Sequence, residues 1–404
     1  MWIPCLLLCP ASWVNYDPCR RFTKRNPEAA GRKNIRDTVN SRRNTREVKK
    51  VLVAMSGGVD SSVAALLLKE GGYEVAGMTM CLGVADSEDS EGVRCCGPAA
   101  IEDARRVCFK LGIPHYVLDY STHLEEKVIK KFIAEYGRGR TPNPCIDCNR
   151  YLKFGTLLET ALVSGFDFLA TGHYAEIGRD EGGYFLKRPR DRAKDQTYFL
   201  YPIAPEALGA ILFPLSPFTK GEVRAMAQKA DLPVAVKKES QDICFVTQKS
   251  YRAFVTGKGL ENRSGEIVDM GGRKLGEHKG IPFYTVGQRS GLGISSPSPL
   301  YVVSLDAERN RIVVGEKKDL QAKGLIAGDV NMLVGAGRLP SVADAKIRYR
   351  KKAARCALSM HKDKLKVVFE ENQEAITPGQ AVVCYHDDRV LVGGVIEEVL
   401  HATH

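Results

Sequence analysis

The stretch KVLVAMSGGVDSS, residues 50–62, decides the fold. Its first six residues form a short apolar run rich in β-branched side chains, which predicts a buried parallel strand. From Val59 to Glu70 apolar residues recur at helical spacing, and two glycines then end the predicted helix. A strand that leads through a short turn into a helix is the unit from which parallel α/β sheets are built.

The turn itself has the chemistry of a phosphate site. Gly57 and Gly58 carry no Cβ, so backbone N–H groups can approach an anion, and the following helix points its positive end at the same place. Ser56 and Ser61 add hydroxyl donors, and Asp60 is a candidate Mg²⁺ ligand. The spacing is not that of a Walker loop, and no G-x-G-x-x-G occurs in the chain. A capped strand–helix turn without a ligand is the alternative.

The same alternation continues along the chain. Strands are predicted at 74–80, 115–119 and 168–171, and helices at 98–111, 124–136 and 154–163. We therefore expect an α/β domain over residues 48–215, with a parallel sheet covered by helices on both faces.

The pattern changes after residue 215. One more helix is predicted at Lys220–Lys229, and from Gly257 the chain is Gly-rich with short strands, including a hairpin over 300–315. Further strands are predicted at 345–350, 364–370, 381–386 and 390–397. We expect a small central domain over 216–297 and a β-barrel over 298–404.

Charge restricts where RNA can bind. The chain has 404 residues and a formal net charge of +11, but residues 1–47 hold ten Lys/Arg and four Asp/Glu, a net +6. Only +5 remains for the other residues, so a nucleic-acid surface must be a local patch. No apolar run approaches the roughly 20 residues that cross a bilayer, so no membrane association is expected.

The first 47 residues are set apart from the fold. They are rich in Arg and Asn without helical periodicity, which predicts disorder. Two interpretations stay open: a transit peptide for a mitochondrion or plastid, or a start site assigned too far upstream, since Val48 directly precedes the first strand. In the second case we expect a bacterial cytoplasmic protein, and in either case a monomer.

A second stretch, TPNPCIDCN at residues 141–149, carries the cysteines. Its prolines predict an extended approach, and the spacing of Cys145 and Cys148 presents both thiols to one centre. Half a zinc site and a redox pair have the same C-x-x-C spacing. No second C-x-x-C or spaced His pair completes a zinc site, and Cys244 is a third candidate thiol.

Six motifs in order resemble the tRNA-specific 2-thiouridylase family. They are SGGVDSS, TPNPCIDCN, ATGHYA at 170–175, KDQTYFL at 194–200, ESQDICF at 239–245 and YTVGQRSGLG at 284–293. The loop alone resembles N-type ATP pyrophosphatases in general, small-molecule synthetases included. The resemblance runs from about Lys49 to the C-terminus and implies an ATP pyrophosphatase α/β domain, a small central domain and a C-terminal β-barrel.

The resemblance also implies binding roles. The residues implied for ATP are Ala54, Met55, Ser56, Gly57, Gly58, Val59, Asp60, Ser61, Met80 and Gly172. Those implied for tRNA are Asn143, Pro144, Cys145, His173, Lys194, Asp195, Gln196, Arg348, Tyr349 and Gln380. Independently, the basic stretch Lys346–Lys352 is predicted as a strand suited to phosphate and base contact, although a solvated edge strand has the same pattern.

The implied reaction has two halves. ATP adenylates O2 of the wobble uridine, and sulfur then replaces that oxygen with release of AMP and pyrophosphate. In the family's persulfide mechanism Cys148 is the nucleophile and Cys244 the persulfide carrier. The sulfur comes from a donor, either a cysteine desulfurase, a relay protein or sulfide.

One residue departs from the family pattern. Many members have Asp where this chain has Cys145. Three thiolates, from Cys145, Cys148 and Cys244, can hold a 4Fe–4S cluster and leave one iron open for sulfide. The alternative is that a cysteine is merely tolerated at this position and the chemistry stays with the other two.

Two other classes remain as rivals. A small-molecule synthetase with the same ATP chemistry would need neither the C-x-x-C nor the basic stretch. A non-catalytic RNA-binding or sulfur-carrier protein would not need an intact SGGVDSS.

Overall fold

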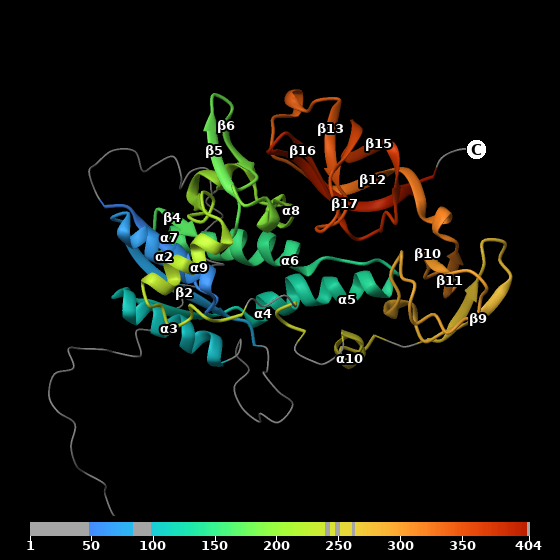
Figure 1. The fold of residues 1–404 in the computed structure, drawn as a ribbon, viewed down its shortest axis with the longest axis horizontal. Coiled ribbons are helices and arrows are strands. Elements are labelled where there is room, and N and C mark those ends of the chain that lie inside the picture. Colours follow the sequence, from blue (N-terminus) through green and yellow to red (C-terminus); the bar gives the residue numbers. More distant parts are fainter. Residues whose placement is uncertain (1–47, 84–97, 239–242, 247–250, 261–262, 402–404) are drawn as a thin grey trace, which may run out of the picture. The chain divides into compact units, whose positions relative to one another are not determined.

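The computed structural model describes residues 48–83, 98–238, 243–246, 251–260 and 263–401 (Figure 1). The expectation of disorder for residues 1–47 lies outside them. All the described residues belong to one compact unit. No helix in this part of the chain is long and apolar enough to cross a membrane.

The predicted parallel sheet is present. Its strands, in the order β3-β2-β1-β4-β7, are β3 (His115–Asp119), β2 (Glu74–Cys81), β1 (Lys50–Ala54), β4 (Phe168–Ala170) and β7 (Ile211–Leu212). All four pairings are parallel. The chain moves from β1 outward through β2 to β3, and then returns to the other side of β1 for β4. Ligands bind at such a reversal, at the carboxyl ends of the strands.

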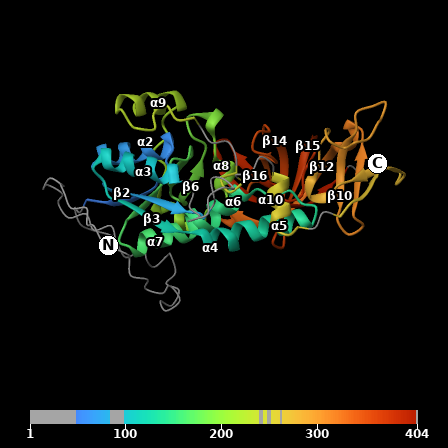
Figure 2. The same ribbon diagram turned by 90° about the horizontal axis from the view of Figure 1, so that it is seen from below.

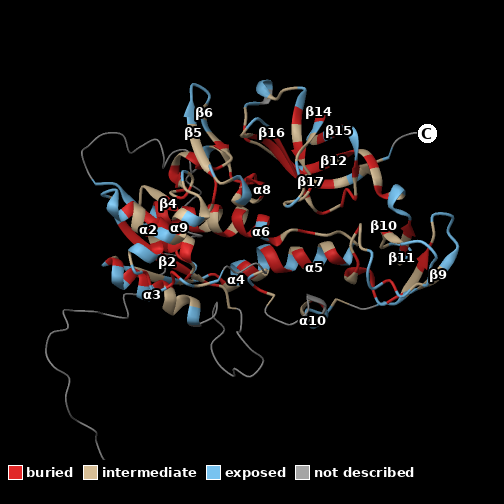
Figure 3. Ribbon diagram, in the orientation of Figure 1, coloured by how far each residue is buried: buried red, intermediate tan, exposed pale blue. Residues whose placement is uncertain are grey.

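Helices cover both faces of this sheet (Figure 2). On one face lie α2 (Val59–Glu70), α3 (Pro98–Leu111) and α9 (Lys220–Lys229), whose apolar residues share one buried cluster with β1 and β2. The other face is covered by α4 (Ser121–Leu124) and α7 (Leu158–Val163). Buried residues line the strands and the inner sides of these helices (Figure 3). The expected α/β architecture of the ATP pyrophosphatases is confirmed.

Two helical runs are longer than the sequence predicted. The helix predicted at 124–136 continues from α4 through η2 (Glu125–Ile129) and α5 (Lys130–Gly137). The helix predicted from 154 starts ten residues earlier, because α6 (Pro144–Asp147) and η3 (Cys148–Leu157) precede α7. Asn143 caps this run and Pro144 is its first residue, so only the approach to it is extended.

A second sheet follows, in the order β10-β11-β8-β9. Its strands are β8 (Gly265–Val268), β9 (Lys274–His278), β10 (Tyr301–Asp306) and β11 (Arg311–Gly315). The hairpin predicted over 300–315 is β10–β11, and it pairs with β8 although the sequence grouped it with the barrel. The remaining short helices are η4 (Arg192–Lys194), α8 (Thr197–Leu200), η5 (Pro205–Ala210), α10 (Tyr251–Gly257), η6 (Ile281–Phe283), η7 (Lys317–Leu320) and η8 (Ala336–Arg338).

The C-terminal strands close into a barrel, as expected. They are β12 (Gln321–Met332), β13 (Val342–Lys346), β14 (Ala354–His361), β15 (Lys364–Glu374), β16 (Ala381–His386) and β17 (Arg389–Leu400), and β12 pairs with both β15 and β17. A hairpin of β5 (Glu176–Asp180) and β6 (Gly183–Lys187) joins β17. The strand predicted over 345–350 is wrong beyond Lys346, since the basic residues after it form a turn.

Candidate active site

The turn after β1 keeps the shape of an anion site. Gly57 has a φ of 67°, and a Cβ there would lie 2.3 Å from the carbonyl oxygen of Ala100. Gly172, just after β4, lies against the first turn of α2, where a Cβ would be 2.6 Å from the Ser61 nitrogen. Both positions therefore require glycine. The structure therefore brings the loop and Gly172 together. The sequence had predicted that both contribute to one nucleotide site.

Hydroxyl groups hold the loop from within. Ser61 Oγ accepts a hydrogen bond from the Ser56 N–H at 3.2 Å and donates to the Gly58 carbonyl at 3.3 Å. Ser62 Oγ donates to the same carbonyl at 2.8 Å. The loop conformation is thus fixed by the protein's own groups, and the loop is preorganised for its ligand.

Asp60 is engaged by a lysine. Lys220 Nζ lies 2.7 and 2.8 Å from the two carboxylate oxygens, and the Tyr174 hydroxyl donates to one of them at 2.9 Å. The Asp60 side chain is 32% exposed and that of Lys220 only 12%. A magnesium ion at Asp60 would therefore have to displace the Lys220 ammonium.

A second lysine secures the loop. Lys237 Nζ donates to the Gly57 carbonyl at 3.0 Å and to Asp103 Oδ2 at 2.6 Å. Sequence reasoning missed both Lys220 and Lys237, because their partners in the loop lie 160 and 180 residues away along the chain. Lys220 did stand at the start of a predicted helix, but nothing in the sequence paired that helix with α2.

The other residues implied for ATP lie at the same sheet edge. Ala54 is the last residue of β1. Met80 is the next-to-last residue of the neighbouring strand β2, which ends at Cys81. Met55 and Val59 are buried, 3% and 5% exposed, and belong to the core cluster. Those two residues can face a nucleotide only through their backbone.

The cysteines lie on the helical run that begins at Pro144. Asn143 Oδ1 accepts from the Cys145 N–H at 3.2 Å, which fixes the first turn. Cys145 reaches the surface, Cys148 is buried, and Cys244 is exposed on the described segment 243–246. Loss of surrounding water raises the pKa of all three thiols, that of Cys244 to about 12, although Cys145 and Cys244 still reach solvent. The charges of Cys148 and Cys145 raise the pKa of Cys244 further.

His173 connects the cysteines with the sheet edge. It follows β4, its Nδ1 is 2.7 Å from Thr171 Oγ1, and its ring lies 5.9 Å from that of Phe154 and 6.1 Å from that of Phe213. Burial holds the pKa of His173 well below its usual value, so the ring is neutral. The Lys153 ammonium lowers the pKa of His173 and of all three thiols. Because Phe154 belongs to the cysteine helix and Gly172 lies against α2, the two halves of the site adjoin at His173.

Two buried polar atoms of TPNPCIDCN have no hydrogen-bond partner among the described residues. They are Thr141 Oγ1 and Asn149 Oδ1, although Asn149 Nδ2 donates to the Phe199 carbonyl at 3.0 Å. Unsatisfied buried groups are rare in native proteins, and these two are free to hydrogen-bond a bound water or ligand. Within the same described ranges, no three His, Cys, Asp or Glu side chains are arranged to hold a metal ion.

Comparisons with known proteins agree with this site. Three family models match in order: a tRNA methyl transferase HUP domain at 49–248, a tRNA methyl transferase PRC-barrel domain at 252–316 and an aminomethyltransferase β-barrel domain at 322–396. The tRNA-specific 2-thiouridylase MnmA 1 of Syntrophus aciditrophicus is 61% identical over 87% of this chain and 94% of its own. The chain belongs to the tRNA-specific 2-thiouridylase family.

Other thiouridylases match over the same length. MnmA of Carboxydothermus hydrogenoformans is 51% identical over 87% of this chain and 98% of its own length. MnmA of Moorella thermoacetica is 49% identical over 86% of this chain and 99% of its own length. A solved 4-thiouridine synthetase–RNA complex with bound ATP aligns with 50% of this chain and 46% of its own at 20% identity. Its TM-score of 0.33 is too low to support an inference.

The three residues of KDQTYFL that are expected to contact tRNA do not share one environment in this structure. Asp195 is buried, and its Oδ1 accepts from the N–H and hydroxyl of Thr197. Gln196 Oε1 accepts from the Tyr174 N–H at 2.8 Å. Lys194 ends the short helix η4 and is half-buried. In this conformation Asp195 and Gln196 shape the segment that carries the lysine.

In the thiouridylase barrel, two expected contacts join domains. Arg348 Nη2 donates to the carbonyls of Val286 and Ala375, both at 3.0 Å, and to Thr377 Oγ1 at 2.6 Å. Gln380 Nε2 donates to the Thr141 carbonyl at 2.8 Å. The Thr141 N–H in turn donates to the Pro378 carbonyl at 2.9 Å, and a Cβ at Gly379 would be 2.7 Å from the Thr141 nitrogen. Residues 378–380 thus lie directly against the start of TPNPCIDCN.

Tyr349 belongs to an aromatic pair that sequence reasoning did not find. Its ring centroid lies 4.4 Å from that of Phe199, with Lys346 Nζ 5.6 Å from the Tyr349 centroid. The Phe199 carbonyl is also the acceptor of the hydrogen bond from Asn149 Nδ2. The aromatic pair therefore connects the basic turn of the barrel with the cysteine helix.

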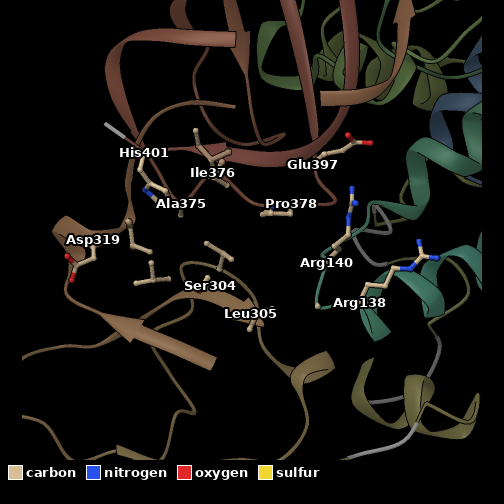
Figure 4. Close-up of a pocket in the computed structure, with 15 residues that line it drawn as sticks. Arg138, Arg140, Ser304, Leu305, Asp319, Ala375, Ile376, Pro378, Glu397 and His401 are labelled. Carbon is tan, nitrogen blue, oxygen red and sulfur yellow. The ribbon is translucent and has the colours of Figure 1, made fainter. Parts of the chain in front are cut away.

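A cavity of about 300 Å³ lies beside the Arg348 contacts, since Val286, Ala375 and Pro378 belong to its lining (Figure 4). Its lining includes Arg138 and Arg140 after α5, Leu305 of β10, and Ile376 and Glu397 of the barrel. None of the residues expected to bind ATP or to carry sulfur lines it.

Proposed function

We propose that the protein is an ATP-dependent tRNA-uridine 2-sulfurtransferase acting at the wobble uridine. The observation that carries this proposal is the adjacency of a preorganised phosphate loop and the helix that bears Cys145 and Cys148, which meet at His173. A small-molecule synthetase would need only the loop. A sulfur carrier without catalysis would need only the thiols.

In the first half-reaction the loop orients ATP. Oxygen O2 of the uridine attacks the α-phosphate, the N3 proton leaves, and pyrophosphate departs. The helix α2 N-terminus and the loop amides stabilise the phosphates, and Lys220 and Lys237 place two ammonium groups at the loop. Asp60 would hold a magnesium ion once Lys220 turns from the carboxylate to a phosphate.

In the second half-reaction sulfur displaces AMP at C2. The target base lies at Asn143–Cys145, where the Thr141 hydroxyl and the Asn149 amide oxygen offer unsatisfied groups. The tRNA runs over His173 and Lys194 toward the barrel, where Tyr349 offers a base-stacking face. A cysteine desulfurase, a relay protein or sulfide supplies the sulfur.

We further propose that Cys145, Cys148 and Cys244 hold a 4Fe–4S cluster. The donor chemistry fits, because three thiols suit such a cluster and leave one iron open. Among the described residues they are not arranged as metal ligands, so cluster binding would have to bring them together. When bound, the cluster would present a hydrosulfide to the base. The protein's own part is to hold the thiols together and to exclude water around Cys148.

One experiment tests the reaction. The full-length protein is assayed for ATP–pyrophosphate exchange with and without tRNA, and the tRNA nucleosides are then analysed by mass spectrometry. Exchange that depends on tRNA, followed by 2-thiouridine, supports the proposal. Exchange without tRNA favours a small-molecule synthetase, and no exchange at all favours a carrier.

A second experiment tests the cluster. Protein purified without oxygen is analysed for iron and sulfide, and thiolation is measured with sulfide as donor. Cys145→Ala should lose the iron and the activity together. Full activity of an iron-free Cys145→Asp variant would show that the two-cysteine mechanism operates.

A further inference from the structure

The helix that carries Cys148 is wider than an α-helix. From Cys148 to Leu157 it is a π-helix, whose hydrogen bonds link residues five apart. The Thr156 hydroxyl likewise donates to the Tyr151 carbonyl, five residues earlier, at 3.1 Å. Wide turns of this kind are uncommon and are often found at functional sites.

The wide turn changes which residue shares a face with Cys148. In an α-helix each residue advances about 100°, so Lys153, five residues on, would point about 140° away from Cys148. In a π-helix the residue five positions on closes the turn instead. Lys153 therefore lies one turn along the helix on the side of Cys148.

Lys153 is a half-buried cation without a counter-ion in the described part of the chain. No described residue forms an ion pair or a hydrogen bond with its ammonium, whereas Lys131 pairs with Asp147 at 2.7 Å and Lys220 with Asp60. Taking a charge out of water is unfavourable unless another charge compensates it. A half-buried, unpaired ammonium is thus suited to an anion that arrives with the substrate.

The neighbours of Lys153 identify that anion. Lys153 lies on the Cys148 side of its helix, and the ring of the next residue, Phe154, lies 5.9 Å from that of His173. The acidic groups of the nucleotide end already have lysines of their own, since Asp60 pairs with Lys220 and Asp103 with Lys237. The anion that has to reach Cys148, on the side of the helix where Lys153 lies, is the sulfur.

We propose that Lys153 stabilises the anionic sulfur as it attacks C2 of the activated uridine. The proposal rests on the thiolation function proposed above. With sulfide as donor, the hydrosulfide electron pair forms the C2–S bond, and the C2–O bond breaks with its pair leaving on AMP. The sulfur's proton ends on N3, which lost one when O2 was adenylated. Lys153 keeps its own proton throughout.

The test separates sulfur transfer from adenylation. Full-length Lys153→Met is compared with the parent in three measurements: thiolation with sodium sulfide as donor, ATP–pyrophosphate exchange with tRNA, and tRNA affinity. We expect thiolation to fall about a hundredfold, the usual effect of removing one charge-stabilising group, with exchange and affinity unchanged. Lys153→Arg should recover part of the rate, because it keeps the charge. Lys130→Met removes an exposed lysine of α5 and should change nothing.

Each contrary outcome has a definite meaning. Parent-like thiolation by Lys153→Met overturns the proposal. So does an equal fall in exchange, which would place the ammonium on the adenylation step, or a loss of tRNA affinity that accounts for the whole effect. Retained exchange shows that the variant is folded. If the parent protein itself does not thiolate tRNA, the proposed function is wrong, and the role proposed for Lys153 is wrong as well.

Discussion

The two halves of the candidate site differ in how far their polar groups already have partners. At the phosphate loop, Asp60 is paired with Lys220, the Gly57 carbonyl with Lys237, and Ser61 with the backbone. Around the cysteines, Lys153 has no counter-ion and Asn149 Oδ1 has no donor in the described ranges. The nucleotide end is complete before its ligand arrives, whereas the sulfur end needs the RNA and the sulfur to satisfy its groups.

The strongest way to sharpen this contrast is to remove the buried thiol. Cys148→Ala should abolish thiolation and leave tRNA-dependent ATP–pyrophosphate exchange intact, because the nucleotide end does not depend on the cysteines. Cys384→Ala, which removes a buried thiol of the barrel, is the matched control. Loss of exchange in Cys148→Ala would show that the two ends are one cooperative unit.

The next largest effect is expected at the loop. Asp60→Asn keeps the shape of the side chain but removes its ion pair with the nearly buried Lys220. We expect exchange to fall about a hundredfold, and the free energy of unfolding to fall by about 1–3 kcal/mol, less than for a fully buried pair. Chemical denaturation measures the second quantity. Asp387→Asn, at a 92% exposed position, is the control and should change neither exchange nor stability. Parent-like exchange in Asp60→Asn would show that this loop is not the ATP site.

A smaller effect is expected where the barrel meets the second sheet. Arg348→Met removes three hydrogen bonds made by one nitrogen, and the orphaned acceptors should lower the free energy of unfolding by about 1–3 kcal/mol. If the rest of the guanidinium contacts an RNA phosphate, the log–log salt slope of tRNA binding falls by about one. We expect both. An unchanged slope would leave Arg348 a purely structural role.

The smallest effect is expected at the anchor of the loop. Lys237→Met loses the hydrogen bond to the Gly57 carbonyl, but the serines still hold the turn. We expect the KM for ATP to rise about fivefold, the equivalent of roughly 1 kcal/mol, with thiolation at saturating ATP unchanged. A hundredfold rise would mean that the loop is not self-supporting.

Local patterns predicted the fold well. The helices at 98–111 and 220–229 and the strand at 115–119 have the predicted bounds, because apolar spacing is clear in each, Gly112 separates the first helix from the strand, and Thr219 caps the second helix. The barrel was predicted from its strand pattern. The strand beyond Lys346 was wrong, because basic residues around an aromatic fit a turn as well as an edge strand.

The site was predicted less completely, for a physical reason. Motifs name residues that are close in sequence, such as the loop and the C-x-x-C. Lys220 and Lys237 reach the loop only through the packing of distant segments, and Phe199 meets Tyr349 across 150 residues. The position of Lys153 beside Cys148 could not be predicted for another reason. Helical spacing in a sequence is interpreted with the α-helical turn, and η3 is a π-helix.

The contact of residues 378–380 with Thr141 restricts how this architecture can be recombined. The N–H and carbonyl of Thr141 find their partners on the barrel, at Pro378 and Gln380, and Gly379 leaves no room for a side chain between them. A fragment that ends before the barrel would expose both groups just ahead of the cysteines. A chimera with a foreign barrel would have to carry Pro-Gly-Gln with it, so domain borders drawn by sheet pairing are not safe points for cutting this chain.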